Sequence, residues 1–502
     1  MIWISLGLFG LILYFIVHYG VSRVTTTPTW MLWLALMIPV VAVGLWASIY
    51  GTQQQMPASI LIPCFVLSLV LYLYLVRVNQ RKPSDLQATD VRAADTEISG
   101  IKSPTVAPSP KPENLLSKEE ESQLQTCFPQ SIYYLQQVDH RPQVVICRGR
   151  LRSQPEEAYH TIQENIQAQF GDRFLVVFQP GAMNKPFFVL VPNPQTQTTK
   201  TRTGSITRPG LALGLFLLTG LTTTFAGASF TDTTLTSQAL FNQPHLLLKG
   251  LPYSLSLLSI LGLHELGHYF ASRLYKLKAT LPYFIPTPYT FFRFGTLGAF
   301  IQMRSPIPHR KALFDIGIAG PLAGFVITLP ILIWGLLHST IVPLPDKSIG
   351  LPFDAFDPTS SVLFTLLSKA VFGANLSLAE GIDLQPMAIA GWLGLIVTAL
   401  NLMPVGQLDG GHIVHAMFGQ RTGAVIGQVA RLLVLILAFI QPLLLLWAII
   451  LLFMPTTDQP ALNDVSELDN TRDLLGLIAL AILAMIILPM PHNLAHLLYG
   501  AF

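Results

Sequence analysis

Residues 251–275 read LPYSLSLLSILGLHELGHYFASRLY, and the interpretation of the whole chain starts from this stretch. It is an apolar run long enough to cross a bilayer as a helix, and it contains the pentapeptide HELGH at 264–268. Histidines four residues apart project from one helical face, so His264 and His268 can reach a single metal ion. Glu265 is placed to act on water as a base instead of binding the metal. Because ionisable groups at membrane depth are costly, this reading is favoured over a chance match or structural core histidines.

The composition is that of a membrane protein. Hydrophobic residues make up 51% of the 502 residues, charged residues make up 11%, and the mean hydropathy is +0.52. The net charge of +3 does not indicate nucleic-acid binding, because the basic residues follow membrane topology. The three cysteines lack CxxC spacing, so neither a disulfide framework nor a cysteine zinc site is indicated. The apolar start at 2–21 argues against a cleaved signal or transit peptide.

The fold class expected is an α-helical polytopic membrane protein with a small inserted α/β domain. Residues 1–79 hold three apolar spans, and residues 209–502 hold six more, each near the length that crosses a bilayer. That gives about nine transmembrane helices in contact with lipid. The expected spans are 2–22, 30–50, 58–78, 210–229, 251–275, 313–338, 386–403, 424–453 and 474–490.

Polar sequence separates the two groups of spans. Residues 80–116 are rich in Pro, Ser and charged residues and are expected to be a disordered linker, as is the shorter stretch 194–208. Between them, residues 117–193 carry β-branched or aromatic runs and a helical pattern that ends at Gly171. We therefore expect a small soluble α/β domain there. Its predicted elements are strands at 144–147, 174–178 and 187–191 and a helix at 156–170.

Lysine and arginine positions orient the spans. If every span crosses once, most basic residues fall on one side together with the soluble domain, and the acidic loop 454–472 falls on the other. Two crossings within 424–453 would spoil this asymmetry, so we predict one despite Pro442. The basic side is then cytoplasmic or its stromal equivalent, while the choice between plasma and thylakoid membranes stays open. His268 lies five residues from Arg273, which puts the metal motif nearer the basic side.

A hydrolytic zinc site needs a third protein ligand and one open position. The candidate is Asp409, in the segment NLMPVGQLDGGH at 401–412, where Pro404 ends a helix and glycines free the backbone. Taken alone, Asp409 would more often cap the next helix. His412 and His415 could substitute as ligands. The pair His492 and His496 has the same spacing as HELGH but lacks a glutamate between the histidines.

HELGH in one membrane helix and NxxPxxxxDG in a later one resemble the site-2 protease family of intramembrane zinc metalloproteases. The resemblance covers residues 205–502 and includes GPLAG at 320–324, where Gly320 and Gly324 would let helices pack closely. No PDZ domain is recognisable. The motif GRLR at 149–152 is similar to the GNLR of the plant chloroplast and cyanobacterial branch, with Arg150 in place of Asn.

The resemblance implies a specific site and activity. It implies Zn²⁺ bound by His264, His268 and Asp409, with Glu265 as general base and Asn401 near the substrate or oxyanion. The implied substrates are transmembrane proteins cut in or near their membrane segments. Two other functions stay open from the residues, a catalytically silent membrane scaffold or chaperone and, less favoured, a metal transporter.

Two further expectations concern access to the site. Residues 281–303 contain prolines, glycines and aromatics, and are too broken for a spanning helix. We predict either a re-entrant hairpin whose edge near 296–301 could pair with an extended substrate, or a plain interfacial loop. The soluble domain carries no candidate ligand, so we hypothesise that it filters substrates by the size of their cytoplasmic portions.

Overall fold

The computed structural model describes residues 27–50, 115–141, 144–181, 185–193, 209–231, 244–287, 292–344, 353–440 and 444–499, with scattered residues between 14 and 75. The chain divides into two compact units, Met1–Ser109 and Pro110–Phe502. In the first unit the predicted span 30–50 is helix α2 (Thr29–Tyr50). The span 2–22, most of 58–78, and almost all of both linkers lie outside the described residues.

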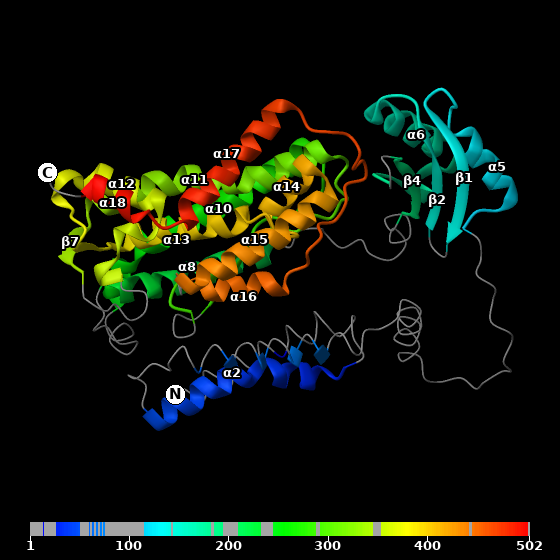
Figure 1. Ribbon diagram of the computed structural model, residues 1–502. Helices are drawn as coiled ribbons and strands as arrows, with labels where there is room; N and C mark the ends of the chain where they lie inside the picture. Colours follow the sequence, from blue (N-terminus) through cyan, green and yellow to red (C-terminus); the bar gives the residue numbers. More distant parts are fainter. Residues whose placement is uncertain are drawn as a thin grey trace. The chain divides into compact units, whose positions relative to one another are not determined.

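An antiparallel four-stranded sheet forms the centre of the small domain, in the order β1-β2-β4-β3. The predicted helix and three predicted strands are all present, but the sequence reading missed β1 and α5. Tyr133, Phe178 and Phe188 are fully buried and pack their rings together in the core. The elements are α5 (Lys118–Thr126), β1 (Tyr133–Arg141), β2 (Val144–Leu151), α6 (Pro155–Phe170), η2 (Gly171–Arg173), β3 (Phe174–Gln179) and β4 (Phe187–Pro192) (Figure 1).

The rest of the second unit is mostly helical. Its helices are α8 (Pro209–Thr231), α10 (Leu251–Leu274), α11 (Arg310–Leu337), α12 (Val362–Phe372), α13 (Pro386–Leu402), α14 (Asp409–Phe418), α15 (Gln420–Ile440), α16 (Leu445–Phe453), α17 (Asn470–Ile487) and α18 (His492–Tyr499). Short 3₁₀ turns are η4 (Pro244–Gly250), η5 (Phe353–Ala355), η6 (Pro358–Ser360) and η7 (Gly373–Asn375). Two small antiparallel sheets of two strands each pair β5 (Tyr283–Pro286) with β6 (Thr296–Phe300) and β7 (Thr340–Pro343) with β8 (Glu380–Asp383).

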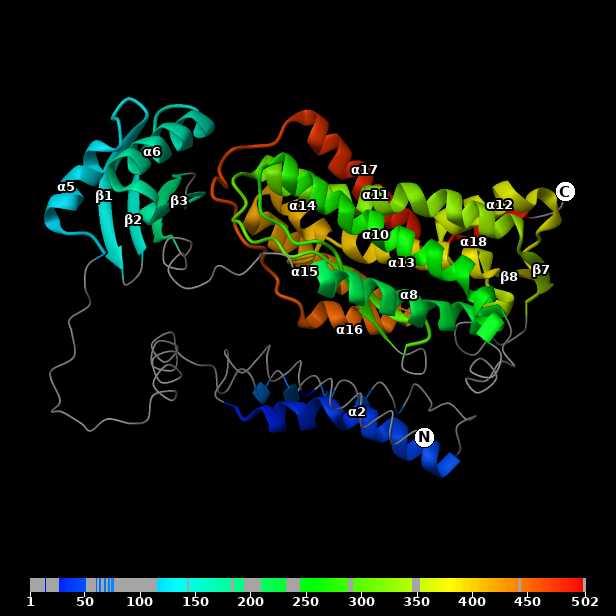
Figure 2. The same ribbon diagram turned by 180° about the vertical axis from the view of Figure 1, so that it is seen from behind.

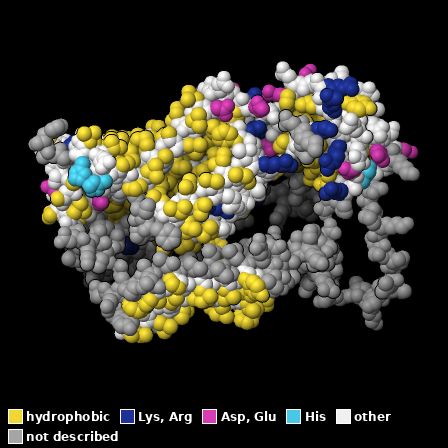
Figure 3. Space-filling model, viewed as in Figure 1, with side chains coloured by type: hydrophobic (Ala, Val, Ile, Leu, Met, Phe, Trp, Pro, Cys, Tyr) yellow, Lys and Arg dark blue, Asp and Glu magenta, His cyan; other side chains and the backbone are white. Residues whose placement is uncertain are grey.

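Within the described residues, six helices are long and apolar enough to cross a membrane: α2, α8, α10 with η4, α11, α15 and α17. The expected total of about nine is not confirmed, because two predicted spans fall outside the description and α13 has only 17 residues. Leucines at 213 and 217 of α8 and at 432 and 433 of α15 are more than half exposed. Hydrophobic side chains accordingly cover much of the helical face in Figure 3, as expected of a surface that meets lipid.

Helices α10, α11 and α13 pack side by side at the centre of this region, and α8 lies along α10 (Figure 2). Glycines make the close approaches possible. A Cβ atom on Gly267 of α10 would lie 2.5 Å from the backbone oxygen of Ala319 in α11. A Cβ atom on Gly391 of α13 would lie 2.7 Å from Leu332 of α11. Helix backbones this close give the central helices little freedom to shift.

The segment 424–453 does not form one crossing, so that prediction is wrong. It contains two helices that pack against each other, α15 and α16. The guanidinium of Arg431, in the middle of α15, donates to the backbone oxygens of Met454 and Pro455 just after α16. Gln420, the first residue of α15, donates to the oxygen of Asp458. The chain therefore turns back and returns to the end from which α15 started.

This reversal also corrects the predicted position of the acidic loop. Backbone hydrogen bonds join Phe178 of the small domain to Leu462 and Asp464. Arg472 pairs with Asp315 near the start of α11. The loop 454–472 thus lies next to the small domain and near the start of α11. The charge count alone had assigned it to the opposite side.

The described parts of the stretch 281–303 pair as a β-hairpin, while its re-entry into the membrane stays a prediction. Its base lies near the C-terminal end of α10, where Ala279 bridges Met303. At its tip, the oxygen of Phe294 accepts a hydrogen bond from Tyr253 at the N-terminal end of the same helix. The hairpin therefore runs along the length of α10, with β5 against α8 and β6 near α10.

Candidate metal centre

Helix α10 places His264 and His268 one turn apart on its buried face. His264 is 3% exposed and His268 is 7% exposed, and their Nε2 atoms lie 3.2 Å apart. The Nδ1 atom of His268 lies 2.7 Å from the backbone oxygen of Ile316 in α11. Such a contact fixes the tautomer in which Nδ1 carries the proton, and it leaves Nε2 free to bind a metal.

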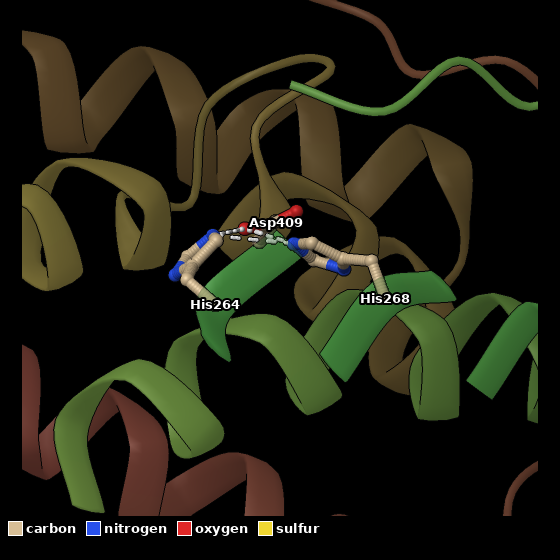
Figure 4. A group of neighbouring side chains, drawn as sticks. All are labelled: His264, His268 and Asp409. Atoms are coloured by element: carbon tan, nitrogen blue, oxygen red, sulfur yellow. Dashed lines mark hydrogen bonds and ion pairs between the residues drawn. The ribbon is translucent and has the colours of Figure 1, made fainter. Parts of the chain in front are cut away.

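A tight turn carries Asp409 to the same point. Gly406 has a φ of +53°, a left-handed conformation that favours glycine. A Cβ atom on Gly410 would lie 1.9 Å from the oxygen of Leu402, so the chain folds closely back on the end of α13. Asp409 is the first residue of α14, and Leu408 occupies the N-cap position without a side-chain cap. The Asp409 carboxylate instead points at the two histidines (Figure 4).

The three side chains fit one zinc ion. Asp409 Oδ2 lies 3.2 Å from His268 Nε2 and 3.5 Å from His264 Nε2. Tetrahedral zinc with bonds near 2.0–2.1 Å separates its ligand atoms by about 3.3 Å. Two imidazoles and one carboxylate are also a donor set that zinc accepts. Among the described residues, these three are the group of histidine, cysteine and acidic side chains that could hold a metal ion.

Glu265 is buried beside this group and is not part of it. The residue is 8% exposed, and its carboxylate interacts with the backbone of Ile301, directly after β6. It therefore lies between the histidines and the hairpin. A carboxylate in this place can accept a proton from water next to the three ligands.

Asn401 and two glycines complete the surroundings of the histidines. The side-chain nitrogen of Asn401, at the end of α13, lies 3.1 Å from His264 Nε2. On the other side, a Cβ atom on Gly320 would lie 2.1 Å from His268 Nε2, and one on Gly324 would lie 3.1 Å from His264 Nδ1. The two glycines of α11 thus face the two imidazoles and leave room for them.

The histidines considered as substitute ligands have other partners. His412 and His415 both contact Asp458 Oδ2 at 2.8 Å through Nδ1, and His415 Nε2 lies 2.9 Å from Asp464 Oδ1. The rings of His492 and His496 in α18 lie against each other at a tilt of 59°. The sequence reading did not single out Asp458 or Asp464 for this role. Their partners lie more than 40 residues away in sequence, so no local spacing could have revealed the contacts.

Comparisons with known proteins match two parts of the chain. A family model described as peptidase family M50 matches residues 252–445, and one described as EGY3 middle domain matches residues 122–198. The chain is 35% identical over 247 residues to "Probable zinc metalloprotease EGY1, chloroplastic" of Arabidopsis thaliana, covering 49% of this chain and 44% of the relative. It is 28% identical over 349 residues to "Probable zinc metalloprotease EGY2, chloroplastic" of Oryza sativa subsp. indica, covering 69% and 62%.

The chain thus spans less than two thirds of the length of these curated relatives. No solved structure matches it. The M50 match contains HELGH, GPLAG and Asp409, and the relatives are named zinc metalloproteases of the chloroplast. Residues 252–445 are therefore similar to peptidase family M50, the site-2 protease family.

Proposed function

We propose that this protein is an intramembrane zinc metalloprotease that cuts membrane proteins in or near their transmembrane segments. The observation that carries the proposal is the convergence of His264, His268 and Asp409 from α10 and α14, with Glu265 beside them. The names of the relatives support both the metal and the reaction. A silent scaffold or a metal transporter would have no need of a carboxylate beside three ligands.

Each residue has a separate part in hydrolysis. His264, His268 and Asp409 hold the zinc, which supplies Lewis-acid polarisation of water and of the substrate carbonyl when bound. Glu265 takes the proton from the attacking water and passes it to the leaving amine. The Asn401 amide donates to the oxyanion that develops on the cut carbonyl, since its nitrogen already faces the ligand group.

The substrate reaches these groups as an extended strand. A transmembrane helix hides its carbonyls in its own hydrogen bonds, so it must unwind before attack. Strand β6 has β5 on one side in a two-stranded sheet, and the chain after β6 leads directly to Ile301 beside Glu265. A substrate strand added to the other edge of β6 would therefore pass the general base.

The proposed setting is a lipid bilayer, with the small domain and the loop 454–472 on the cytoplasmic or stromal side. The relatives are named chloroplastic, which supports a chloroplast membrane or its equivalent as the setting. The lysine and arginine positions in the sequence favour this side under the positive-inside rule. The partners are transmembrane protein substrates and lipid, without nucleic acid.

The Glu265→Gln variant tests the proposal. It keeps the size of the side chain and removes the proton acceptor, so zinc content should persist while cleavage of a transmembrane reporter falls by about 10²–10⁴-fold. Glu467→Gln, at an exposed acidic position, is the matched control and should cleave like the wild type. Cleavage by Glu265→Gln at the wild-type rate would reject the mechanism. Zinc binding without any cleavage by the wild type would favour a scaffold or transporter.

A further inference from the structure

Residues 454–464, which follow α16, contact the chain on both sides of Asp409. On the N-terminal side is the turn at Gly406. A Cβ atom there would lie 2.1 Å from the backbone oxygen of Pro455, so the two backbones are in close contact. Any displacement of Pro455 would therefore free the turn that delivers Asp409 to the histidines. Arg431 holds Pro455 in place through its backbone oxygen, at 2.9 Å.

On the C-terminal side, the same segment holds helix α14. Asp458 contacts His412 and His415, one and two turns after Asp409, while Asp464 contacts the far nitrogen of His415. His415, Asp458 and Asp464 are each at most 7% exposed. Charged hydrogen bonds between buried groups are strong and directional, so they fix α14 relative to the segment.

The segment is also where the small domain attaches. The Phe178 N–H donates to the Leu462 oxygen at 2.6 Å, and the Asp464 N–H donates to the Phe178 oxygen at 2.9 Å. Gln179 Nε2 donates to the Ala461 oxygen at 3.2 Å. The side chains of Leu462 and Val465 pack against the core of the small domain. The sheet of the small domain thus extends beyond its edge strand β3 to the segment that holds α14, through a parallel bridge between Phe178 and Asn463.

We propose that residues 454–464 position the metal ligand Asp409 and couple its placement to the docking of the small domain. Asp458 and Asp464 are positioning residues, because they act on Asp409 through His412, His415 and the turn at Gly406. A docked domain keeps the segment in place and the ligand group complete. Loss of docking loosens α14, and Asp409 then moves away from the histidines. The inference rests on the proposed zinc site, but it does not require proteolysis.

The first experiment measures zinc affinity by chelator competition in the full-length Asp458→Asn variant. Affinity should fall on the order of tenfold, at the low end of the 10–100-fold effects of residues that support metal ligands. The visible spectrum of the Co²⁺-loaded variant should change as Asp409 shifts relative to the two histidines. Glu467→Gln removes a neighbouring exposed carboxylate and should change neither readout.

Wild-type affinity and an unchanged Co²⁺ spectrum in folded Asp458→Asn would overturn the positioning role. If that variant does not fold, His412→Gln replaces it, since it removes one of the two histidine partners of Asp458 and is only partly buried. A smaller loss of zinc affinity is expected there, and none would overturn the proposal. Zinc affinities are obtained whether or not the protein cleaves a substrate, so a failed protease assignment would be recognised separately.

The second experiment weakens docking in the full chain. Leu462→Ser removes a side chain that packs on the small domain and leaves Asp458 and Asp464 unchanged. We expect faster proteolytic release of the small domain, faster amide exchange in α14, and a loss of zinc affinity in the same direction as in Asp458→Asn. Faster release with wild-type exchange and affinity would overturn the coupling to the small domain.

Discussion

At the scale of residues, the ligand group follows from two short motifs, and Asp409 lies 141 residues after His268 and 145 after His264. The four-residue spacing of His264 and His268 requires only helical geometry, so the sequence alone predicted this pair. Asp409 needed the family resemblance, because an aspartate before a helix is more often a cap. The contacts of His415 with Asp458 and Asp464 could not be predicted, since they depend on how α15 and α16 return the chain.

Gly320→Ala should damage the ligand group directly. The added methyl would lie 2.1 Å from His268 Nε2, so the imidazole must leave its place or α11 must move away. We expect zinc content to fall well below one ion per chain and cleavage to be lost, as measured by metal analysis and a reporter assay. Gly324→Ala, with 3.1 Å to His264, should have a milder effect.

Gly214→Ala is the matched control in α8, where an added methyl meets nothing within 4 Å. Replacing glycine by alanine inside a helix stabilises the fold by roughly 0.5–1 kcal/mol. This variant should therefore bind zinc like the wild type. Normal zinc content in Gly320→Ala would show that α11 yields easily and that the glycine is not required by the ligands.

At the scale of elements, sequence reading succeeded where periodicity was strong and failed where long-range packing decides. The helix α6 and three strands of the small domain have clear patterns. Strand β1 was missed because YYLQQVDHR is an edge strand with mostly polar residues. The α15–α16 reversal was missed because the span was judged by charge balance. A buried Arg431 that binds the backbone beyond α16 stabilises the returning chain.

The contact between α14 and the acidic segment should make stability depend on pH. Burial alone would lower the pKa of His415, but its hydrogen bonds to Asp458 and Asp464 outweigh burial and raise the pKa to about 9. Burial would raise the pKa of Asp458, and its histidine partners lower it instead. Arg310 also faces this group, since its guanidinium donates to the His415 backbone oxygen.

Because the folded pKa of His415 lies above its ordinary 6.5, its stabilisation is complete below pH 6.5 and is lost as the pH rises through 9. The contribution of Asp458 is present above its ordinary 3.8 and is lost as the pH falls through its lowered pKa. The melting temperature of the wild type should therefore fall more steeply between pH 6.5 and 9 than that of His415→Gln. Parallel curves for the two proteins would contradict this account.

At the scale of the whole molecule, the second unit joins the small domain to the helical region that holds the metal centre. The sequence predicted a soluble domain joined by polar linkers to a membrane core. The structure joins them through β3 and residues 461–464. The idea that the domain filters substrates by size stays a prediction. The number of spans in the N-terminal unit does too, because most of that unit lies outside the described residues.

The corrected topology can be tested by labelling single cysteines placed in a background without Cys64, Cys127 and Cys147. Ser117→Cys and Glu467→Cys, both at exposed positions, should react with an impermeant reagent from the same side of the membrane. His338→Cys, exposed just after the opposite end of α11, should react only from the other side. Labelling of positions 117 and 467 from opposite sides would restore the single crossing of 424–453.

The most direct measurement is the zinc content of purified wild-type protein and of Asp409→Ala. The account predicts about one zinc per wild-type chain, held by three protein ligands with one position open. It predicts loss of zinc from Asp409→Ala, because two imidazoles alone hold the ion too weakly to survive purification, while Glu467→Ala keeps it. Full zinc retention in Asp409→Ala would contradict the assignment of the metal centre.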